Sequence, residues 1–307
     1  MHELIILGSG PAGCTAALYA ARAGFKPLVL EGMQPGGQLT QTTDIENFPG
    51  FEQPVNGYEL VTAMRRQAER FGAVFEMDEC TGADFSGPIK KLETMVSGTL
   101  EARAVILATG ASARYLGLES ERALLGHGVS GCATCDGAFF RGKEVAVAGG
   151  GDTACEDALF LAKLCAKVTL IHRRDTLRAS KVMAERVLAT PNIVPAWNSV
   201  VVAVEDPAKG AVEAVRLRNV LTGEETRLPV SALFVAIGHT PNTAFLRGAL
   251  ALDAQGYIAT RGVKTSAEGV FSAGDVQDPA YKQAIVAAGS GAQAALEAER
   301  YLLATQA

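Results

Sequence analysis

What this sequence has little of excludes several kinds of protein. Six cysteines among 307 residues are too sparse for the disulfide framework of a secreted domain. The formal net charge is −5 and no basic run is longer than the pairs Arg65-Arg66 and Arg173-Arg174, which argues against a general binder of nucleic acid or membrane surfaces. No apolar run approaches the ~18 residues of a membrane span. Met1-His2-Glu3 leads directly into an apolar run without a basic segment, so we see no signal peptide and expect a cytoplasmic protein.

The beginning of the chain carries a nucleotide-binding pattern. The apolar run Leu4 to Leu7, typical of a buried strand, is followed by Gly8-Ser9-Gly10-Pro11-Ala12-Gly13 and an alanine-rich helical stretch. Glu31 then directly follows the next strand, Pro27 to Leu30. The three glycines would allow a tight turn, close approach of the backbone to a pyrophosphate, and close packing of helix on strand. Glu31 would accept hydrogen bonds from an adenosine ribose. The long polar loop with Gly36-Gly37-Gln38-Leu39 and Glu46 to Gly50 is typical of a ligand-binding loop.

The same design recurs in the second half of the chain. A strand at Glu144 to Ala148 meets Gly149-Gly150-Gly151-Asp152-Thr153-Ala154, and His172 follows Gly149 by 23 positions, as Glu31 follows Gly8. In place of the acid the sequence has His172-Arg173-Arg174, with Arg178 four positions after Arg174. Arginines at this place favour a ribose that carries a 2′-phosphate, because guanidinium groups bind phosphate through two hydrogen bonds. The second motif therefore predicts NADPH.

The order of these segments predicts the fold. Each motif is followed by short strands of a β-meander and then by an apolar strand, one ending at Thr109-Gly110 and the other at Ile237-Gly238. The last ~60 residues are too few for a separate core, so we expect them to complete the first domain. We predict an α/β fold of two Rossmann-like, three-layer domains, each with a β-meander and the second inserted into the first. The FAD-binding domain would comprise residues 1–112 and 245–307, and the NADPH-binding domain residues 113–244.

Between the two motifs lies the one pair of cysteines with functional spacing, Cys132-Ala133-Thr134-Cys135, followed directly by Asp136. Such a pair closes a small disulfide, but the same spacing makes half of a zinc site. The neighbours favour redox chemistry, since a motif with an acid and a motif with arginines indicate FAD and NADPH in one chain. Flavin accepts a hydride and passes electrons on, and this cysteine pair is the acceptor that the sequence offers.

The chain resembles, nearly from end to end, the bacterial low-molecular-weight NADPH-dependent thioredoxin reductases. The resemblance is carried by motifs along the whole sequence: GSGPAG at Gly8 to Gly13, GGQL at Gly36 to Leu39, ENFPG at Glu46 to Gly50, ATGA at Ala108 to Ala111, CATCDG at Cys132 to Gly137, GGGDTA at Gly149 to Ala154, HRRDTLRA at His172 to Ala179, AIGHTPNT at Ala236 to Thr243, AGD at Ala273 to Asp275 and KQA at Lys282 to Ala284.

The resemblance implies an enzyme that reduces thioredoxin and works as a homodimer, in addition to the absence of nucleic-acid and membrane partners expected from the charge. It implies FAD contacts at Gly8, Gly10, Pro11, Ala12, Gly13, Glu31, Gly36, Gly37, Gln38, Leu39, Asn47, Thr109, Gly110, Gly274, Asp275, Lys282, Gln283 and Ala284. It implies NADPH contacts at Gly149, Gly151, Asp152, Thr153, His172, Arg173, Arg174, Arg178, Ile237 and Gly238. The helix that begins near Gln283 would direct its positive end at the flavin.

In this family Cys135 would receive electrons from the flavin, Cys132 would attack the thioredoxin disulfide, and Asp136 would protonate the departing thiolate. The cysteine pair and the NADPH motif lie in the inserted domain, yet both must reach one flavin, and the dithiol must then reach a protein. We therefore expect the inserted domain to rotate about the two crossings of the chain.

Three alternatives remain at this point. A flavoprotein reductase of another disulfide protein, such as a peroxiredoxin, usually carries an extra N-terminal domain, whereas this chain begins at the FAD strand. A ferredoxin–NADP reductase of similar architecture would lack the cysteine pair. A zinc protein would need two further ligands, and no second CxxC or CxxH is present.

Overall fold

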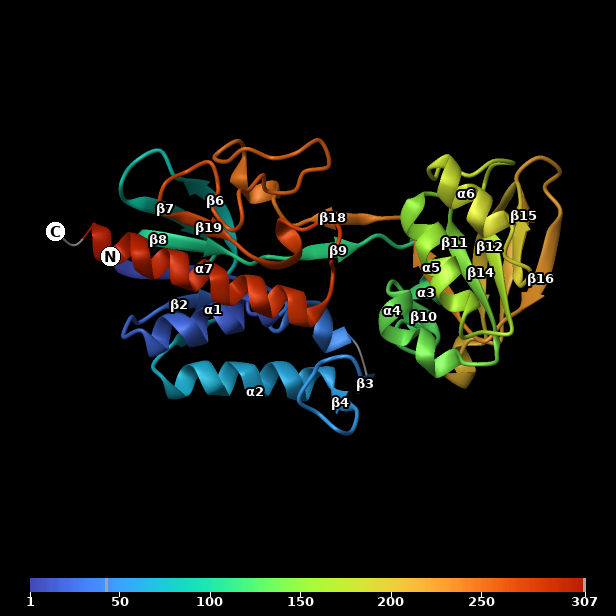
Figure 1. The fold of residues 1–307 in the computed structure, drawn as a ribbon, viewed down its shortest axis with the longest axis horizontal. Helices are drawn as coiled ribbons and strands as arrows, with labels where there is room; N and C mark the ends of the chain where they lie inside the picture. The colour runs from blue at the N-terminus through green and yellow to red at the C-terminus, as the bar shows by residue number, and fades with distance from the viewer. Residues whose placement is uncertain (42–43, 306–307) are drawn as a thin grey trace. The chain divides into compact units, whose positions relative to one another are not determined.

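The computed structural model describes residues 1–41 and 44–305 (Figure 1). The chain divides into two compact units: Met1–Ser112 together with Thr240–Ala307, and Ala113–His239. The second unit is thus inserted into the first, as predicted, but the chain returns at residue 240, whereas we expected residue 245. The reason is local. β18 (His239–Pro241) already pairs with β9 (Ala111–Ala113), and the Asn242 side chain donates to the Thr109 carbonyl at 2.8 Å.

The first unit is built on a parallel sheet. Its strands follow the order β5-β2-β1-β8, with β19 paired to β8. The bounds are β1 (His2–Leu7), β2 (Leu28–Leu30), β5 (Val74–Glu76), β8 (Thr99–Leu107) and β19 (Val270–Ser272). β6 (Cys80–Asp84) and β7 (Lys90–Thr94) continue from β8 as an antiparallel meander, and β3 (Asp44–Ile45) pairs with β4 (Val55–Asn56).

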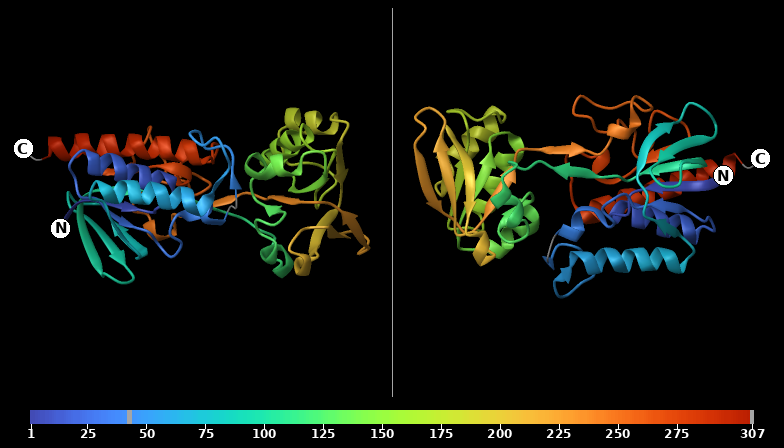
Figure 2. Two further views of the ribbon diagram at one scale, coloured as in Figure 1. Left: turned by 90° about the horizontal axis from the view of Figure 1, so that it is seen from below. Right: turned by 180° about the vertical axis from the view of Figure 1, so that it is seen from behind.

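Both faces of this sheet are covered. Leu4 and Ile6 of β1 belong to one apolar core, and Ile5 and Leu7 belong to another, which explains why the strand is a continuous apolar run. Three helices lie along one face: α1 (Pro11–Arg22), α2 (Gly57–Arg70) and α7 (Ala284–Ala304) (Figures 1 and 2).

α1 and α7 pack backbone against backbone. A Cβ atom on Gly291 would lie 2.1 Å from the carbonyl oxygen of Ala12, so only glycine fits there. The alanine-rich sequences of both helices permit this approach, and it ties the C-terminal helix to the first nucleotide motif.

The second unit contains a five-stranded parallel sheet of order β10-β17-β11-β12-β13. Its strands are β10 (Val129–Ser130), β11 (Glu144–Gly149), β12 (Lys167–Ile171), β13 (Ile193–Ala196) and β17 (Leu233–Ala236). The second unit has two apolar cores. An antiparallel meander packs against one of them and consists of β14 (Ser199–Glu205), β15 (Ala214–Asn219) and β16 (Glu225–Pro229). The helices α5 (Asp152–Ala162) and α6 (Lys181–Leu188) pack against the other. The short helices α3 (Glu119–Ala123) and α4 (Ala133–Asp136) complete the unit. This is the predicted fold class.

No helix within residues 1–41 and 44–305 combines the length and the apolar character needed to cross a bilayer.

The entry of the chain into the second unit depends on one buried carboxylate. Glu121 is fully buried and accepts backbone N–H bonds from Leu116 at 2.8 Å, Gly117 at 2.9 Å and Leu118 at 3.3 Å. Glu121→Ala leaves three donors unpaired, so we expect a loss of about 3 kcal/mol or more in the free energy of unfolding. Urea unfolding followed by the fluorescence of Trp197, the single tryptophan, reports on this unit. Glu119→Ala, on the exposed side of the same helix, is the control. Equal midpoints for the two variants would contradict this role.

Candidate active site

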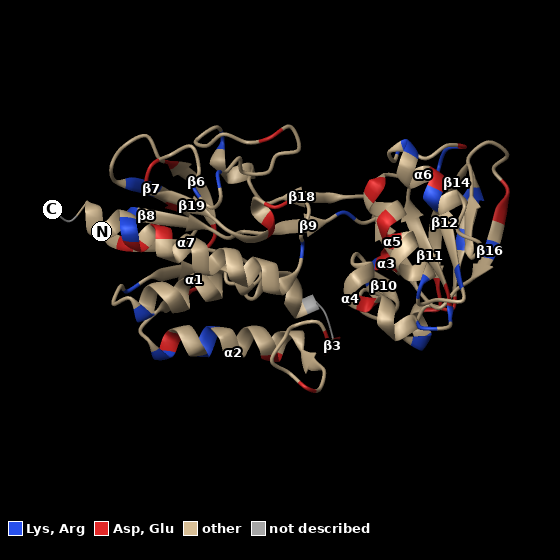
Figure 3. Ribbon diagram, in the orientation of Figure 1, with Lys and Arg blue, Asp and Glu red and all other residues tan. Residues whose placement is uncertain are grey.

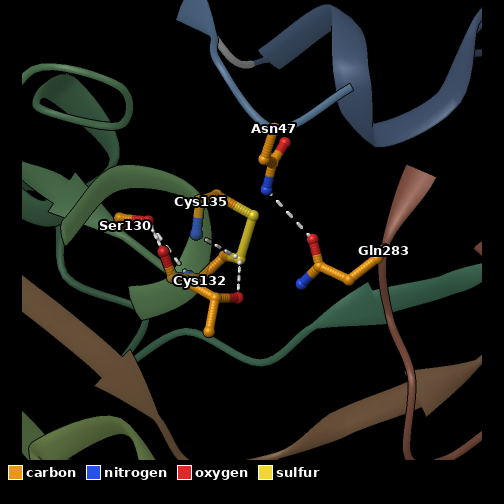
Figure 4. Close-up of a disulfide and its surroundings, with 6 residues drawn as sticks. Asn47, Ser130, Cys132, Cys135 and Gln283 are labelled. Carbon is orange, nitrogen blue, oxygen red and sulfur yellow. Dashed lines mark hydrogen bonds between the residues drawn. A yellow bond between two sulfur atoms is a disulfide. The ribbon is translucent and has the colours of Figure 1, made fainter. Parts of the chain in front are cut away.

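The two cysteines of the CxxC segment form a disulfide, Cys132–Cys135 (Figure 4). The segment begins where β10 ends, at the carboxyl edge of the parallel sheet, and Cys132 is the N-cap of the single-turn helix α4. The backbone N–H of Cys135 donates to the Cys132 sulfur at 3.2 Å, and the Thr134 hydroxyl lies 3.5 Å from the same sulfur. Donors directed at a sulfur stabilise its thiolate, so the geometry favours Cys132 as the nucleophile once the disulfide is reduced.

Asp136 lies at the end of α4 and is half-buried. Burial raises the pKa of its carboxyl group above the ordinary value, and a hydrogen bond with the Ser130 side chain opposes that rise in pKa. A carboxyl with a raised pKa next to a dithiol is suited to hold a proton and release it during exchange.

The first nucleotide motif has the shape of a phosphate cradle. Gly8 has φ +103°, and a Cβ there would lie 2.3 Å from the Ala108 oxygen; a Cβ on Gly13 would lie 1.9 Å from the Gly8 oxygen. α1 begins at Pro11 with no side-chain cap and no acid in its first turn, which leaves its N–H groups for an anion. The Ser9 hydroxyl accepts from Gly36 N at 2.9 Å and so holds the GGQL loop against the cradle.

The residues expected around the rest of the FAD also come from several elements of the first unit. Glu31 is buried directly after β2, and its carboxylate pairs with Arg65 at 3.2 Å. The Asn47 side chain donates to Gln283, the N-cap of α7, at 3.2 Å (Figure 4). Burial raises the pKa of Asp275 to about 6.

Hydrogen bonds also join the segments that follow β8 and β19 to other parts of the first unit. Asn242 bonds the Thr109 carbonyl, its own backbone N–H donates to Gly110 at 3.0 Å, and the Ser290 hydroxyl accepts from Gly274 N at 2.8 Å. The Gln38 side chain donates to the Ala111 carbonyl. Sequence reasoning assigned no role to Ser9, Arg65, Asn242 or Ser290. Ser9 and Asn242 lie inside recognised motifs and could have been found, whereas Arg65 and Ser290 are ordinary helix residues.

The second nucleotide motif repeats the cradle. A Cβ on Gly149 would lie 2.5 Å from the Ala236 oxygen, and α5 begins after Gly151 with no side-chain cap. Asp152 is already hydrogen-bonded, because its carboxylate accepts from the Ser180 backbone N–H at 2.9 Å. Hydrogen bonds with the backbone and the side chain of Ser180 lower the pKa of Asp152. Ile237 and Gly238 follow the end of the neighbouring strand β17.

His172 and the arginines after it differ in environment. His172 is 4% exposed, its Nε2 atom has no hydrogen-bond partner, and burial lowers its pKa, so it is a neutral ring at the floor of the motif. A Cβ on Gly150 would lie 2.2 Å from its Nδ1 atom. Arg173, Arg174 and Arg178 are exposed, and none of them forms an ion pair with another described residue. Three unpaired guanidinium groups beside an uncapped helix fit a phosphorylated ribose.

Within the described part of the chain, no group of three or more His, Cys, Asp or Glu side chains is placed to hold a metal ion. The two glycine cradles with uncapped helices fit two dinucleotides, and the disulfide lies at the edge of one of their sheets. Together they define a nucleotide-dependent disulfide oxidoreductase.

Comparison with known proteins agrees with this class. Residues 2–291 match the model of the pyridine nucleotide-disulphide oxidoreductase family. The chain is 52% identical to a thioredoxin reductase of Mycolicibacterium smegmatis, over 98% of this chain and 97% of that one. It is also 52% identical to a bifunctional thioredoxin reductase/thioredoxin of Mycobacterium leprae, over 98% of this chain and 66% of that one. The solved thioredoxin reductase of Streptococcus pyogenes is similar with a TM-score of 0.93 at 38% identity, over 99% of each chain.

The chain therefore belongs to the pyridine nucleotide-disulphide oxidoreductases and, within them, to the thioredoxin reductases. The predicted family, fold class, enzyme activity and use of FAD and NADPH are confirmed by these matches.

Proposed function

We propose that the physiological substrate of this reductase is a thioredoxin, which it reduces through Cys132 and Cys135 at the expense of NADPH. The observation that carries the proposal is the Cys132–Cys135 disulfide, in which one sulfur receives a backbone N–H bond. A further support is the relative whose name joins thioredoxin reductase and thioredoxin in one chain.

We assign FAD to the unit formed by residues 1–112 and 240–307, and NADPH to the inserted unit. The buried acid Glu31 supports the first assignment, and the unpaired Arg173, Arg174 and Arg178 support the second. The remaining contacts follow the residues predicted from the sequence. Bound FAD accepts a hydride from NADPH and passes two electrons to the disulfide.

The reduced pair then exchanges with the substrate. The Cys132 thiolate attacks one sulfur of the thioredoxin disulfide, so that a mixed disulfide forms and a thiolate leaves. Asp136, in its protonated form, gives its proton to that thiolate. Cys135 next attacks the Cys132 sulfur, and its thiol proton passes to the second departing thioredoxin thiolate, which restores the Cys132–Cys135 disulfide and releases reduced thioredoxin. Two electrons pass from the enzyme dithiol to the substrate.

Two properties belong to the same proposal. The dithiol must meet both flavin and thioredoxin, which requires the inserted unit to rotate about its two connecting strands. We also propose a cytoplasmic homodimer without nucleic acid or membrane partners. Basic and acidic residues interspersed along the chain of both units support the last point (Figure 3).

The test is a comparison of protein substrates. Purified holoenzyme with NADPH should reduce oxidised thioredoxin with a kcat/KM of at least about 10⁴ M⁻¹ s⁻¹, followed by NADPH absorbance. An oxidised peroxiredoxin supplied without thioredoxin should give no more than background oxidation, because the substrate disulfide must dock beside the cysteine pair. Faster turnover with the peroxiredoxin than with thioredoxin would favour the peroxiredoxin alternative instead.

A further inference from the structure

Glu31 is a buried acid beside the first nucleotide motif, and the sheet fixes its backbone. The Gly8 backbone N–H donates to the Leu30 carbonyl at 2.8 Å, so the glycine cradle and the acid lie at the same edge of the sheet. The Glu31 backbone N–H donates at 2.9 Å to the carbonyl of Glu76, the last residue of β5. Only 4% of the Glu31 side chain is exposed. A carboxylate buried to this degree needs a charged or hydrogen-bonding partner, because burial removes its water.

Arg65 of α2 is that partner, and it engages one of the two carboxylate oxygens. Its Nη1 atom lies 3.2 Å from Oε2 of Glu31. A carboxylate can accept about four hydrogen bonds through its two oxygens. The ion pair with Arg65 therefore leaves Oε1 of Glu31 able to accept a hydrogen bond from a hydroxyl group of a ligand.

Two further contacts hold the Arg65 side chain in place. Its Nε atom donates at 3.0 Å to Oε1 of Glu69, which lies one turn further along α2. Its guanidinium carbon lies 5.1 Å from the centre of the Phe75 ring in β5, which is within the range of a cation–π contact. Three contacts on one guanidinium group leave it few orientations. The ion pair therefore fixes the direction of the Glu31 carboxylate as well as its charge environment.

We propose that Arg65 is a positioning residue for the flavin nucleotide, which holds the Glu31 carboxylate so that its second oxygen accepts a hydroxyl group of the adenosine ribose. This inference rests on the proposed assignment of FAD to the first unit. Arg65 lies outside the glycine motif and acts on the ribose through Glu31. An acceptor that is already oriented strengthens binding, because less conformational freedom is lost when the ligand arrives.

The test measures the binding of FAD to the full chain after its FAD has been removed, followed by the change in flavin fluorescence. Arg65→Ala should weaken FAD binding by about threefold to thirtyfold, because the hydrogen bond from the ribose to a charged acceptor is misaligned. An FAD analogue that carries 2′,3′-dideoxyadenosine lacks both ribose hydroxyl groups, so Arg65→Ala should bind it as tightly as the wild type does. Arg66→Ala is the matched control, since Arg66 is the exposed neighbour on α2, and it should bind FAD like the wild type.

A second set of variants tests whether Arg65 acts through Glu31. Glu31→Gln should weaken FAD binding at least as much as Arg65→Ala, and Arg65→Ala added to Glu31→Gln should weaken it no further. Wild-type FAD affinity in Arg65→Ala, equal losses for FAD and the analogue, or additive losses in the double variant would overturn the positioning role. Unchanged FAD binding by Glu31→Gln would overturn the assignment of the FAD ribose to Glu31 and the inference with it, while the reduction of thioredoxin would stand.

Discussion

Replacing Cys132 by serine is expected to lower the reduction of thioredoxin by at least about a thousandfold, because the attacking thiolate is removed and a serine hydroxyl is not ionised near neutral pH. Cys135→Ser should lose steady-state turnover as well, but for another reason. It keeps the Cys132 nucleophile, whose sulfur carries the backbone N–H bond, and lacks the thiol that releases the substrate. It should therefore accumulate a mixed disulfide with thioredoxin, visible on a non-reducing gel and by intact mass.

The control for these variants is Cys80→Ser. Cys80 is a free, partly buried thiol in the first unit whose sulfur donates to the Gly82 carbonyl, a bond that a serine hydroxyl can also make. Its activity should equal that of the wild type. A stable mixed disulfide formed by Cys132→Ser in place of Cys135→Ser would reverse the roles assigned to the two cysteines.

The second large effect is expected at the three exposed arginines of the inserted unit. Replacing Arg173, Arg174 and Arg178 by alanine should lower kcat/KM for NADPH by about 100-fold or more, because each charge-assisted bond to phosphate contributes about 1.5–3 kcal/mol. Activity with NADH, which has no 2′-phosphate, should change little. The preference for NADPH over NADH would then nearly disappear, measured as the ratio of the two kcat/KM values.

Arg186→Ala is the matched control, since Arg186 is an exposed arginine of α6 outside the motif. It changes the net charge without touching the proposed phosphate site and should retain the preference. Equal losses with NADPH and NADH in the triple variant would show that the arginines support the fold or the nicotinamide, and would contradict a phosphate site.

The sequence determined much of this protein because its decisive features are local. The run Gly8 to Gly13 between a strand and a helix needs glycine for backbone reasons that no distant residue can supply, and the same holds at Gly149. The acid Glu31 in the first motif contrasts with His172 at the same spacing in the second, where Arg173 and Arg174 follow directly. This contrast indicated the two cofactors, and the matches to known reductases confirm them. The cysteine spacing permitted a disulfide, which the structure contains.

Other features were decided only by tertiary structure, since they join residues far apart in the chain. The return of the chain at residue 240 depends on pairing between β9 and β18. Arg65 reaches Glu31 from α2, and Gly291 meets Ala12 across two helices. Even within the CxxCD turn, the burial that raises the pKa of Asp136 comes from the packing around it. Spacing along the chain brings residues to a turn, but the dielectric environment and partners of a side chain are set by the elements folded against it.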